Sequence, residues 1–306
     1  MKNFKMATLV GSAIATLGFM GAIAAPANAG TLYNGWNYSI DNFNDGSGGA
    51  DYNYKGLASI DTGDQIIFAL SAGLNYNENS SSNLTHGDLF LNFSGGDFDT
   101  ANGTESLLAV KFAPNDTTLT AGLYKNVTGG DLNNFATINH AGHNYKSLKQ
   151  YDNSGFLKNT NAYGTDLSTK QEVYDYFYSD AVANSPTTSN TPFMNAIQSG
   201  TKVGDVSMLN KTNLDGLGLD FAHFNAVGSD IFGIAIDKSR LQEILPGGIN
   251  DFMAHVILEC GNDGVALAGN FALPEEDTTV PEPSTLLGLS AIGLAFLRKR
   301  RQPSVS

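Results

Sequence analysis

Cysteine and positive charge are scarce in this sequence. Its 306 residues include one cysteine, Cys260, which excludes an intramolecular disulfide and a zinc site built from several cysteines. There are 17 Lys and Arg residues against 30 Asp and Glu residues, which gives a formal net charge of −13. A nucleic-acid-binding surface needs clustered basic residues to displace the counterions of the phosphate backbone. The composition therefore argues against nucleic acid as a partner.

Charge of either sign is sparse, and neutral polar residues take its place. Charged residues make up 15% of the chain, against roughly 25% in an average soluble domain. The chain has 34 Gly and 31 Asn residues, which favour turns. A hydrophobic fraction of 42% is enough to bury a core and argues against global disorder. Between the two basic ends, residues 30–280 hold 11 basic and 29 acidic residues, so 11 − 29 gives a net charge of −18.

The N-terminal residues have the pattern of a secretory signal peptide. Two lysines in the first five residues precede an apolar segment that runs over about 6–25. Ala27 and Ala29 then place small side chains at the −3 and −1 positions before Gly30, as signal peptidase requires. We therefore predict a signal peptide over residues 1–29 and a mature chain that begins at Gly30. An uncleaved membrane anchor is the alternative.

The C-terminal residues combine three features in a fixed order. An acidic linker from residue 275 leads to Pro281-Glu282-Pro283, and an apolar run over 285–297 follows. A basic cluster comes directly after this run and consists of Arg298, Lys299, Arg300 and Arg301. The 13 residues of the apolar run span about 20 Å as a helix, less than the ~30 Å hydrocarbon core. Basic residues retained on the cytoplasmic side, with snorkelling, would hold the run across the inner membrane.

This C-terminal arrangement resembles the PEP-CTERM sorting signal of exosortase substrates in Gram-negative bacteria and cyanobacteria. The resemblance implies that exosortase, a membrane enzyme, recognises the tail and cleaves near Pro281-Glu282-Pro283. It also implies release or transfer of the protein to the cell surface or extracellular matrix. A simple membrane anchor with a chance Pro-Glu-Pro is the alternative.

The body of the chain resembles a family of cyanobacterial exosortase-dependent surface proteins. The residues that carry this resemblance are YNGWNY at 33–38, GDLFLNF at 87–93 and HVILECGND at 255–263. The resemblance implies a location outside the cell and brings no activity and no catalytic residues with it.

The body also has the signals of a sheet protein. Apolar or alternating segments predict strands at 64–71, 87–93, 107–112, 230–236, 252–258 and 264–269. Helical spacing predicts helices over 171–182 and 237–245. We predict one mainly β domain over 30–274, an antiparallel sandwich of jelly-roll type with a few short helices and a helical or loop excursion over about 126–215. A signal helix and a C-terminal hydrophobic helix flank it, and residues 275–306 form the linker and sorting signal.

No catalytic motif stands out in the body. His255 lies five positions before Cys260, and an odd spacing on a strand places the two side chains on opposite faces. We therefore predict an inert cysteine and no nucleophilic pair. A polysaccharide hydrolase stays open as an alternative, because its two carboxylates, held ~5–10 Å apart, come from positions that sequence does not reveal.

Metal-site patterns are weak. Asp41 and Asp45 begin a segment like an EF-hand loop, but Phe43 and Tyr52 occupy ligand positions of that loop. Asp97 and Asp99 form a second cluster of carboxylate oxygens. His140 and His143 lack the Glu of a zinc-protease helix. We expect no obligatory cofactor, with these four aspartates as candidates for a structural calcium site.

Aromatic residues among amides indicate possible contact with sugars. Two groups have this character, and they consist of Tyr33, Trp36 and Tyr38 near the mature start and Tyr145, Tyr151 and Tyr163 in the polar middle. Core packing is the competing explanation for any of these rings. We expect an exported, non-enzymatic surface or matrix protein with a structural or adhesive role in the exopolysaccharide layer. The alternatives are an exported hydrolase and a calcium-dependent adhesin.

Overall fold

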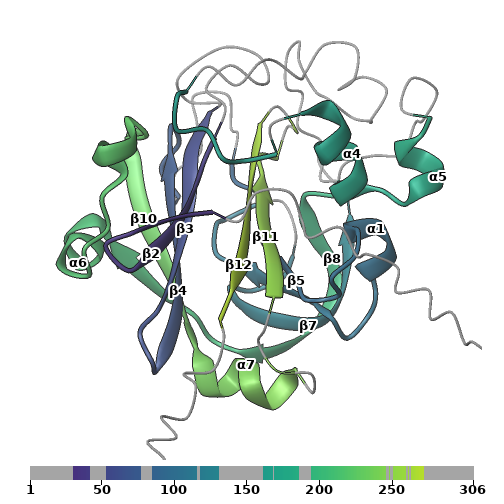
Figure 1. Ribbon diagram of the computed structural model, residues 1–306. Helices are drawn as coiled ribbons and strands as arrows, with labels where there is room; N and C mark the ends of the chain where they lie inside the picture. Colours follow the sequence, from purple (N-terminus) through teal and green to yellow (C-terminus); the bar gives the residue numbers. More distant parts are fainter. Residues whose placement is uncertain are drawn as a thin grey trace, which may run out of the picture.

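The structure is a computed structural model of the chain (Figure 1). It describes residues 30–41, 53–76, 85–115, 118–130, 161–167, 169–185, 194–245, 248, 251–259, 261 and 263–271. The predicted signal peptide and the whole sorting tail lie outside these residues. So do Asp45, His140, His143, Tyr145, Tyr151 and Cys260. Gly30, the predicted mature N-terminus, is described, and a Cβ there would lie 2.2 Å from Asn37 Oδ1.

Within the described residues, the strands form two six-stranded antiparallel sheets. The first sheet has the order β1-β2-β3-β4-β10-β9. Its strands are β1 (Thr31–Tyr33), β2 (Trp36–Ile40), β3 (Tyr54–Asp61), β4 (Gln65–Ala72), β9 (Ser207–Asn210) and β10 (Asp230–Asp237). The second sheet has the order β12-β11-β5-β6-β7-β8. Its strands are β5 (Leu89–Asn92), β6 (Leu107–Lys111), β7 (Gly122–Gly130), β8 (Ala196–Gly204), β11 (Asp251–Ile257) and β12 (Gly264–Asn270).

The chain visits the two sheets twice in turn. Strands β1 to β4 form a meander in the first sheet, and β5 to β8 form a meander in the second. The chain then returns to add β9 and β10 beside β4, and finally β11 and β12 beside β5. The two sheets pack face to face as a sandwich, and the core lies between their inner faces.

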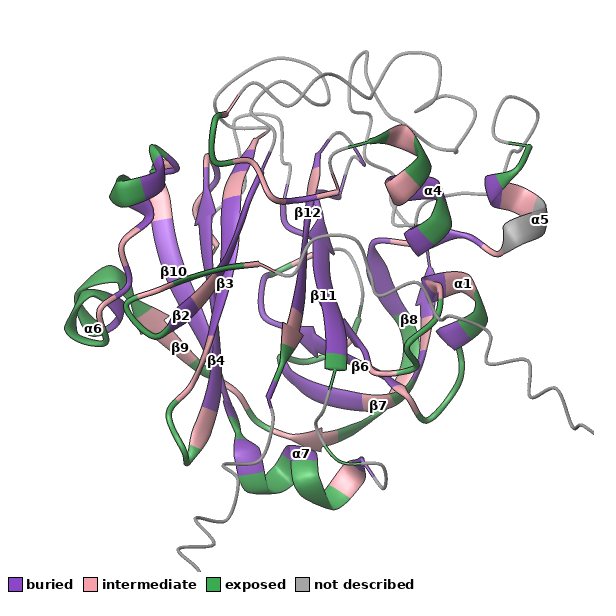
Figure 2. Cartoon of the chain, in the orientation of Figure 1, coloured by how far each residue is buried: buried purple, intermediate pink, exposed green. Residues whose placement is uncertain are grey.

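The strands carry apolar side chains on both faces. In β4, Ile66, Phe68 and Leu70 belong to the central core between the sheets, while Ile67 and Ala69 belong to a cluster on the outer face. Side chains of a strand alternate between faces, so a strand that is apolar throughout needs a cover on each side. Figure 2 shows most strand residues buried.

Short helices cover the two outer faces. On the second sheet, α1 (Phe98–Ala101), α4 (Lys170–Phe177) and α5 (Asp180–Ala183) pack over one apolar cluster. On the first sheet, α6 (Lys211–Gly216) and the 3₁₀ turn η2 (Phe221–Phe224) cover another. Figure 1 places these two groups on opposite sides of the sandwich, with α7 (Lys238–Ile244) at one end. The fold therefore has a central core and two outer clusters.

The prediction of a mainly β antiparallel fold with few short helices is confirmed. All six predicted strands are present within one or two residues of their expected bounds. The helix expected over 171–182 is divided, because Tyr178 adopts extended backbone angles and ends α4. The range 126–215, expected to be a helical or loop excursion, also contains β8 and β9. These two strands are more polar than the others, so their composition gave no strand signal.

The central core predicts a large loss of stability when an inner-face ring is removed. Phe68 is fully buried and packs edge-on against Phe252 and Phe271. We expect Phe68→Ala to lower the free energy of unfolding, measured by urea denaturation, by about 3–5 kcal/mol. Leu32→Ala on the edge strand β1 is the control, because Leu32 is 78% exposed and its loss should change that free energy by less than about 0.5 kcal/mol. Similar losses in both variants would contradict this placement of the core.

Candidate functional site

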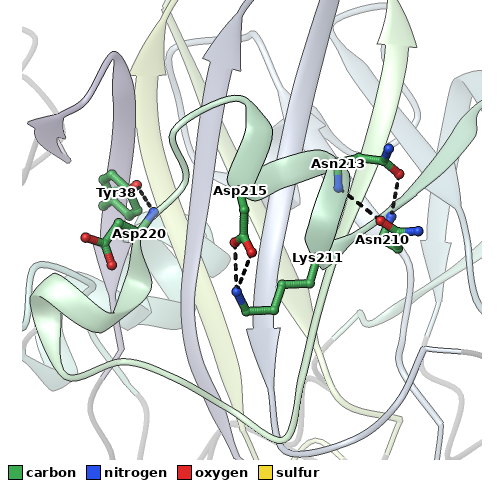
Figure 3. Close-up of polar contacts among 6 residues, drawn as sticks. All are labelled: Tyr38, Asn210, Lys211, Asn213, Asp215 and Asp220. Carbon is green, nitrogen blue, oxygen red and sulfur yellow. Dashed lines mark hydrogen bonds and ion pairs between the residues drawn. The ribbon is translucent and has the colours of Figure 1, made fainter.

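We call α6, η2 and the residues that join or directly follow them the cover of the first sheet. Local capping forms its helix, and a close approach of α6 to β10 seats it on the sheet. Asn210 and Asn213 form a capping box at the start of α6, with Asn213 N–H donating to Asn210 Oδ1 at 3.0 Å (Figure 3). Lys211 Nζ donates to both carboxylate oxygens of Asp215 at 2.7 Å. Beneath the helix, a Cβ on Gly233 would lie 2.7 Å from Leu214 Cδ2. The absence of a side chain at Gly233 therefore lets α6 lie directly on β10.

Two aromatic residues of β2 fasten this cover to the sheet. The indole N–H of Trp36 donates to the Leu217 carbonyl at 2.9 Å. The backbone N–H of Asp220 donates to the Tyr38 hydroxyl at 2.8 Å (Figure 3). Trp36 and Tyr38 are fully buried, and burial raises the pKa of Tyr38 to about 12. Both rings were candidates for sugar contact, and their burial makes them anchors of the cover instead.

Three rings from distant parts of the chain meet at the surface of the cover. Tyr33 of β1 stacks on His223 of η2, with ring centroids 4.0 Å apart and planes 12° apart. The ring centroid of Tyr163 lies 6.3 Å from that of His223. The Tyr163 ring also packs edge-on against Phe224, with ring centroids 5.7 Å apart. Phe224 is buried beneath, while Tyr163 is 44% exposed and His223 is exposed. We call Tyr33, Tyr163, His223 and Phe224 the aromatic surface.

Hydrogen bonds on both sides fix the position of Tyr163. The Asn161 side chain donates to the Phe224 carbonyl at 3.2 Å and accepts from the Tyr163 N–H at 3.0 Å. The backbone N–H of Thr165 donates to the Ile40 carbonyl at 3.0 Å, and Ile40 N–H donates back to Thr165 Oγ1 at 3.0 Å. The segment 161–167 is thus attached to η2 at one end and to β2 at the other.

Polar groups surround the aromatic surface. Asp220 caps η2, with its Oδ1 accepting from His223 N–H at 3.1 Å. Asn225 follows η2 in the left-handed conformation with φ 53°, and Asn34 occupies the turn before β2 with φ 49°. Exposed rings beside amide and carboxylate groups offer an apolar face and hydrogen-bonding partners together, as small-molecule sites do.

Exposed apolar side chains also gather on this side. The large hydrophobic residues exposed in the described part of the chain are Leu32, Tyr163, Leu217 and Val227. Leu217 lies between α6 and η2, and Val227 follows η2, so both belong to the same cover as the aromatic surface. Grouped exposed apolar side chains mark surfaces that interact with something else.

Buried carboxyl groups elsewhere have structural partners. Asp166 accepts from Leu167 N–H at 2.6 Å and from Ala266 N–H at 3.0 Å, and the carboxyl of Asp41 interacts with it. Burial raises the pKa of Asp166 to about 6. Two carboxyls that interact with each other in the interior leave no space for a sugar between them, whereas glycosidase carboxyls stand ~5–10 Å apart.

Two other calcium candidates, Asp97 and Asp99, belong to the start of helix α1. Asp97 is the N-cap of α1, and both of its carboxylate oxygens accept hydrogen bonds from Thr100. Asp99 lies in the first turn of the same helix. Over the described ranges, no group of three His, Cys, Asp or Glu side chains is placed to hold a metal ion.

Two buried histidines serve the core. His255 Nδ1 lies 2.7 Å from the Tyr176 hydroxyl, and its ring stacks on Phe90 with centroids 5.1 Å apart. Burial lowers the pKa of His255 to about 3. His86 Nε2 lies 3.1 Å from the Leu74 carbonyl, which only accepts, so that nitrogen carries the proton and Nδ1 accepts from the Tyr54 hydroxyl. Burial lowers the pKa of His86 to about 4.

Sequence reasoning missed His223 as a member of the surface. The signal available was the run Phe221 to Asn225, in which a histidine and an amide lie among aromatic residues. Nothing in that run indicates its proximity to Tyr33 or Tyr163.

The buried His255 predicts a specific loss of stability in acid. Its pKa falls from about 6.5 when exposed to about 3 in the fold, so its contribution to stability is complete above about pH 6.5 and is lost as the pH falls toward 3. The double variant Tyr176→Phe/His255→Phe removes both polar groups together, so the stability of its fold no longer depends on protonation of His255. Between about pH 7 and about pH 5, the wild-type chain should lose on the order of 2 kcal/mol more than this double variant in urea denaturation.

An exposed residue that does not titrate supplies the control for this experiment. Gln198→Ala should keep the pH dependence of the wild-type chain, because it removes no ionisable group. A double variant with the same pH dependence as the wild type would show that His255 is not linked to folding in this way.

Comparisons with known proteins bear on the tail. Among the described residues, no helix is long and apolar enough to span a membrane. Searches of curated proteins and of solved structures found no match. Residues 279–301 match the family model of the PEP-CTERM protein-sorting motif. This match confirms the predicted sorting motif and supports exosortase-dependent sorting to the cell surface.

Proposed function

We propose that this chain is an exported, non-enzymatic surface protein whose body contacts carbohydrate polymer through the aromatic surface. The observation that carries this proposal is the convergence of the exposed Tyr163 and His223 with the half-buried Tyr33 at one place on the cover of the first sheet. The sorting motif at 279–301 supports delivery to the cell surface, where such a polymer would be met. An aromatic ring offers a flat apolar face to the C–H groups of a sugar, and neighbouring amides bind its hydroxyls.

The contacts of the cover fit a binding surface that is formed before the ligand arrives. Tyr163 is fixed through Asn161, and His223 is fixed by the cap of Asp220 and by its stack on Tyr33. Rings that are already ordered lose little conformational entropy on binding, which favours affinity.

The alternatives have less support. A hydrolase needs two carboxyls separated by a substrate, and the buried carboxyls of Asp41 and Asp166 interact with each other instead. A calcium-dependent adhesin needs free carboxylate oxygens, and Asp97 uses both of its oxygens in a cap. We therefore place the proposed contact at the aromatic surface and assign no catalytic residue.

The processing steps complete the proposal. Signal peptidase would cleave between Ala29 and Gly30 during export. The run 285–297 and its basic cluster would then hold the precursor in the inner membrane until exosortase cleaves near Pro281-Glu282-Pro283. The resemblance of the body to cyanobacterial exosortase-dependent surface proteins is consistent with this route.

Removal of an exposed ring should weaken polysaccharide binding. We expect Tyr163→Ala to weaken retention on the exopolysaccharide of the producing cells by about five- to tenfold, since about 1 kcal/mol of stacking is lost. Affinity electrophoresis in gels that contain this polysaccharide measures the effect. Tyr163→Phe should bind nearly as well as the wild type, because it keeps the ring.

The surface control is Gln198→Ala, which removes an exposed side chain from β8 in the second sheet, away from the aromatic surface. It should leave retention unchanged. The proposal fails if Tyr163→Ala, with an unchanged melting temperature, is retained as strongly as the wild type.

Deletion of the tail tests the sorting route separately. Without residues 281–306, we expect the protein to lose both exosortase processing and surface display, because the enzyme has no motif to recognise. Mass spectrometry of surface and secreted fractions locates the termini of each form. A variant with serine at all four positions of the basic cluster should be anchored less well before cleavage; these positions are Arg298, Lys299, Arg300 and Arg301. Unchanged display of the deleted form would overturn the sorting route.

A further inference from the structure

The charge around the aromatic surface narrows the kind of polymer that it can bind. Three described segments build this surface: 30–41, 161–167 and 207–228. Their one Lys or Arg is Lys211, which is already paired with both carboxylate oxygens of Asp215. Asp220 stands at the start of η2, next to His223. The surface therefore offers amides, hydroxyls and a carboxylate, with no unpaired Lys or Arg in those three segments.

Within these three described segments, an acidic polysaccharide would find no unpaired counter-charge. Carboxylate and sulfate groups on polymers are recognised by Arg and Lys through charge-assisted hydrogen bonds. An anionic polymer would also approach a body whose residues 30–280 carry a net charge of −18. Repulsion of this kind slows encounter and weakens binding at low ionic strength. Neutral sugars have no such cost, and their hydroxyls match amide and carboxylate groups.

We propose that the aromatic surface selects neutral polysaccharide and rejects polyuronate and sulfated polymers. This inference rests on the proposed function, because it assigns a ligand class to the same surface. Asp220 supplies the local part of the selectivity, since its carboxylate lies beside the exposed His223. The net charge of the body supplies the rest.

The test compares neutral and acidic polymers with the exported protein. Affinity electrophoresis with a neutral glucan and with a polyuronate should show binding to the glucan at least about tenfold tighter at low salt. A rise from about 20 mM to about 200 mM salt should strengthen the residual binding to polyuronate and leave glucan binding unchanged. Tyr163→Ala should weaken glucan binding, which places the contact at the aromatic surface.

A charge variant isolates the role of Asp220. Asp220→Asn keeps a residue that caps η2 and removes the carboxylate charge. We expect the ratio of polyuronate affinity to glucan affinity to rise about two- to threefold in this variant, because the carboxylate no longer repels the acidic polymer. Asp205→Asn is the matched control, because Asp205 is 90% exposed in the turn between β8 and β9 and belongs to another part of the surface. It should change neither affinity.

The outcomes separate this inference from the proposed function. Binding of polyuronate as tight as that of glucan, lost in Tyr163→Ala, would overturn the neutral preference and keep the carbohydrate contact. Binding of polyuronate that disappears with a chelator would show a bridging cation and would also overturn the preference. No binding to any polymer, the native exopolysaccharide included, would overturn the proposed function itself.

Discussion

The burial of both faces of each sheet is the constraint from which the rest of the structure follows. Strands such as β4 carry Ile66 and Phe68 toward the partner sheet, but they also carry Ile67 and Ala69 outward. An apolar outer face left in water would lose the free energy that its burial supplies, so each sheet needs a cover. The chain provides the covers from the segments that join its strands. The candidate surface is part of one of these covers.

The same constraint explains how a functional surface arises on a chain with few charges. The cover of the first sheet must approach β10 and β2 closely, and Gly233 and the hydrogen bonds of Trp36 and Tyr38 permit this approach. Once seated, the cover turns its inner side toward the core and its outer side toward water. The aromatic surface is at that outer side, where rings in contact with the buried cluster reach solvent.

Buried polar groups add specificity to a core without disulfides. Asp166 accepts from the backbone of β12, and His255 pairs with Tyr176 of α4, so each ties a cover to the second sheet. Burial raises the pKa of the acid and lowers the pKa of the histidine, because low polarity disfavours the charged form of both. These groups therefore position the cover, and His255 stays uncharged near neutral pH.

Local pattern predicted some parts of the fold and missed others for identifiable reasons. The apolar runs of β4, β10 and β11 are short, continuous and bounded by turns, so their strand character was visible. Strand β8 has the sequence AIQSGTKVG, with two buried residues at its start and polar or exposed residues beyond, so its composition resembles a loop. Helix α4 ends at Phe177 because Tyr178 turns into extended backbone, although helical spacing continues beyond it. Trp36 and Tyr38 looked like sugar contacts because a sequence does not distinguish a buried ring from an exposed one.

By itself the sequence determined the sorting motif, the charge of the body and the sheet character of the fold. These properties are local, since each depends on residues that are adjacent or evenly spaced along the chain. Only the tertiary structure decided which rings form a surface, because Tyr33, Tyr163 and His223 come from a strand, a connecting segment and a 3₁₀ turn. Their meeting depends on the cover docking over the first sheet, and that docking results from contacts between residues more than a hundred positions apart, such as Trp36 and Leu217.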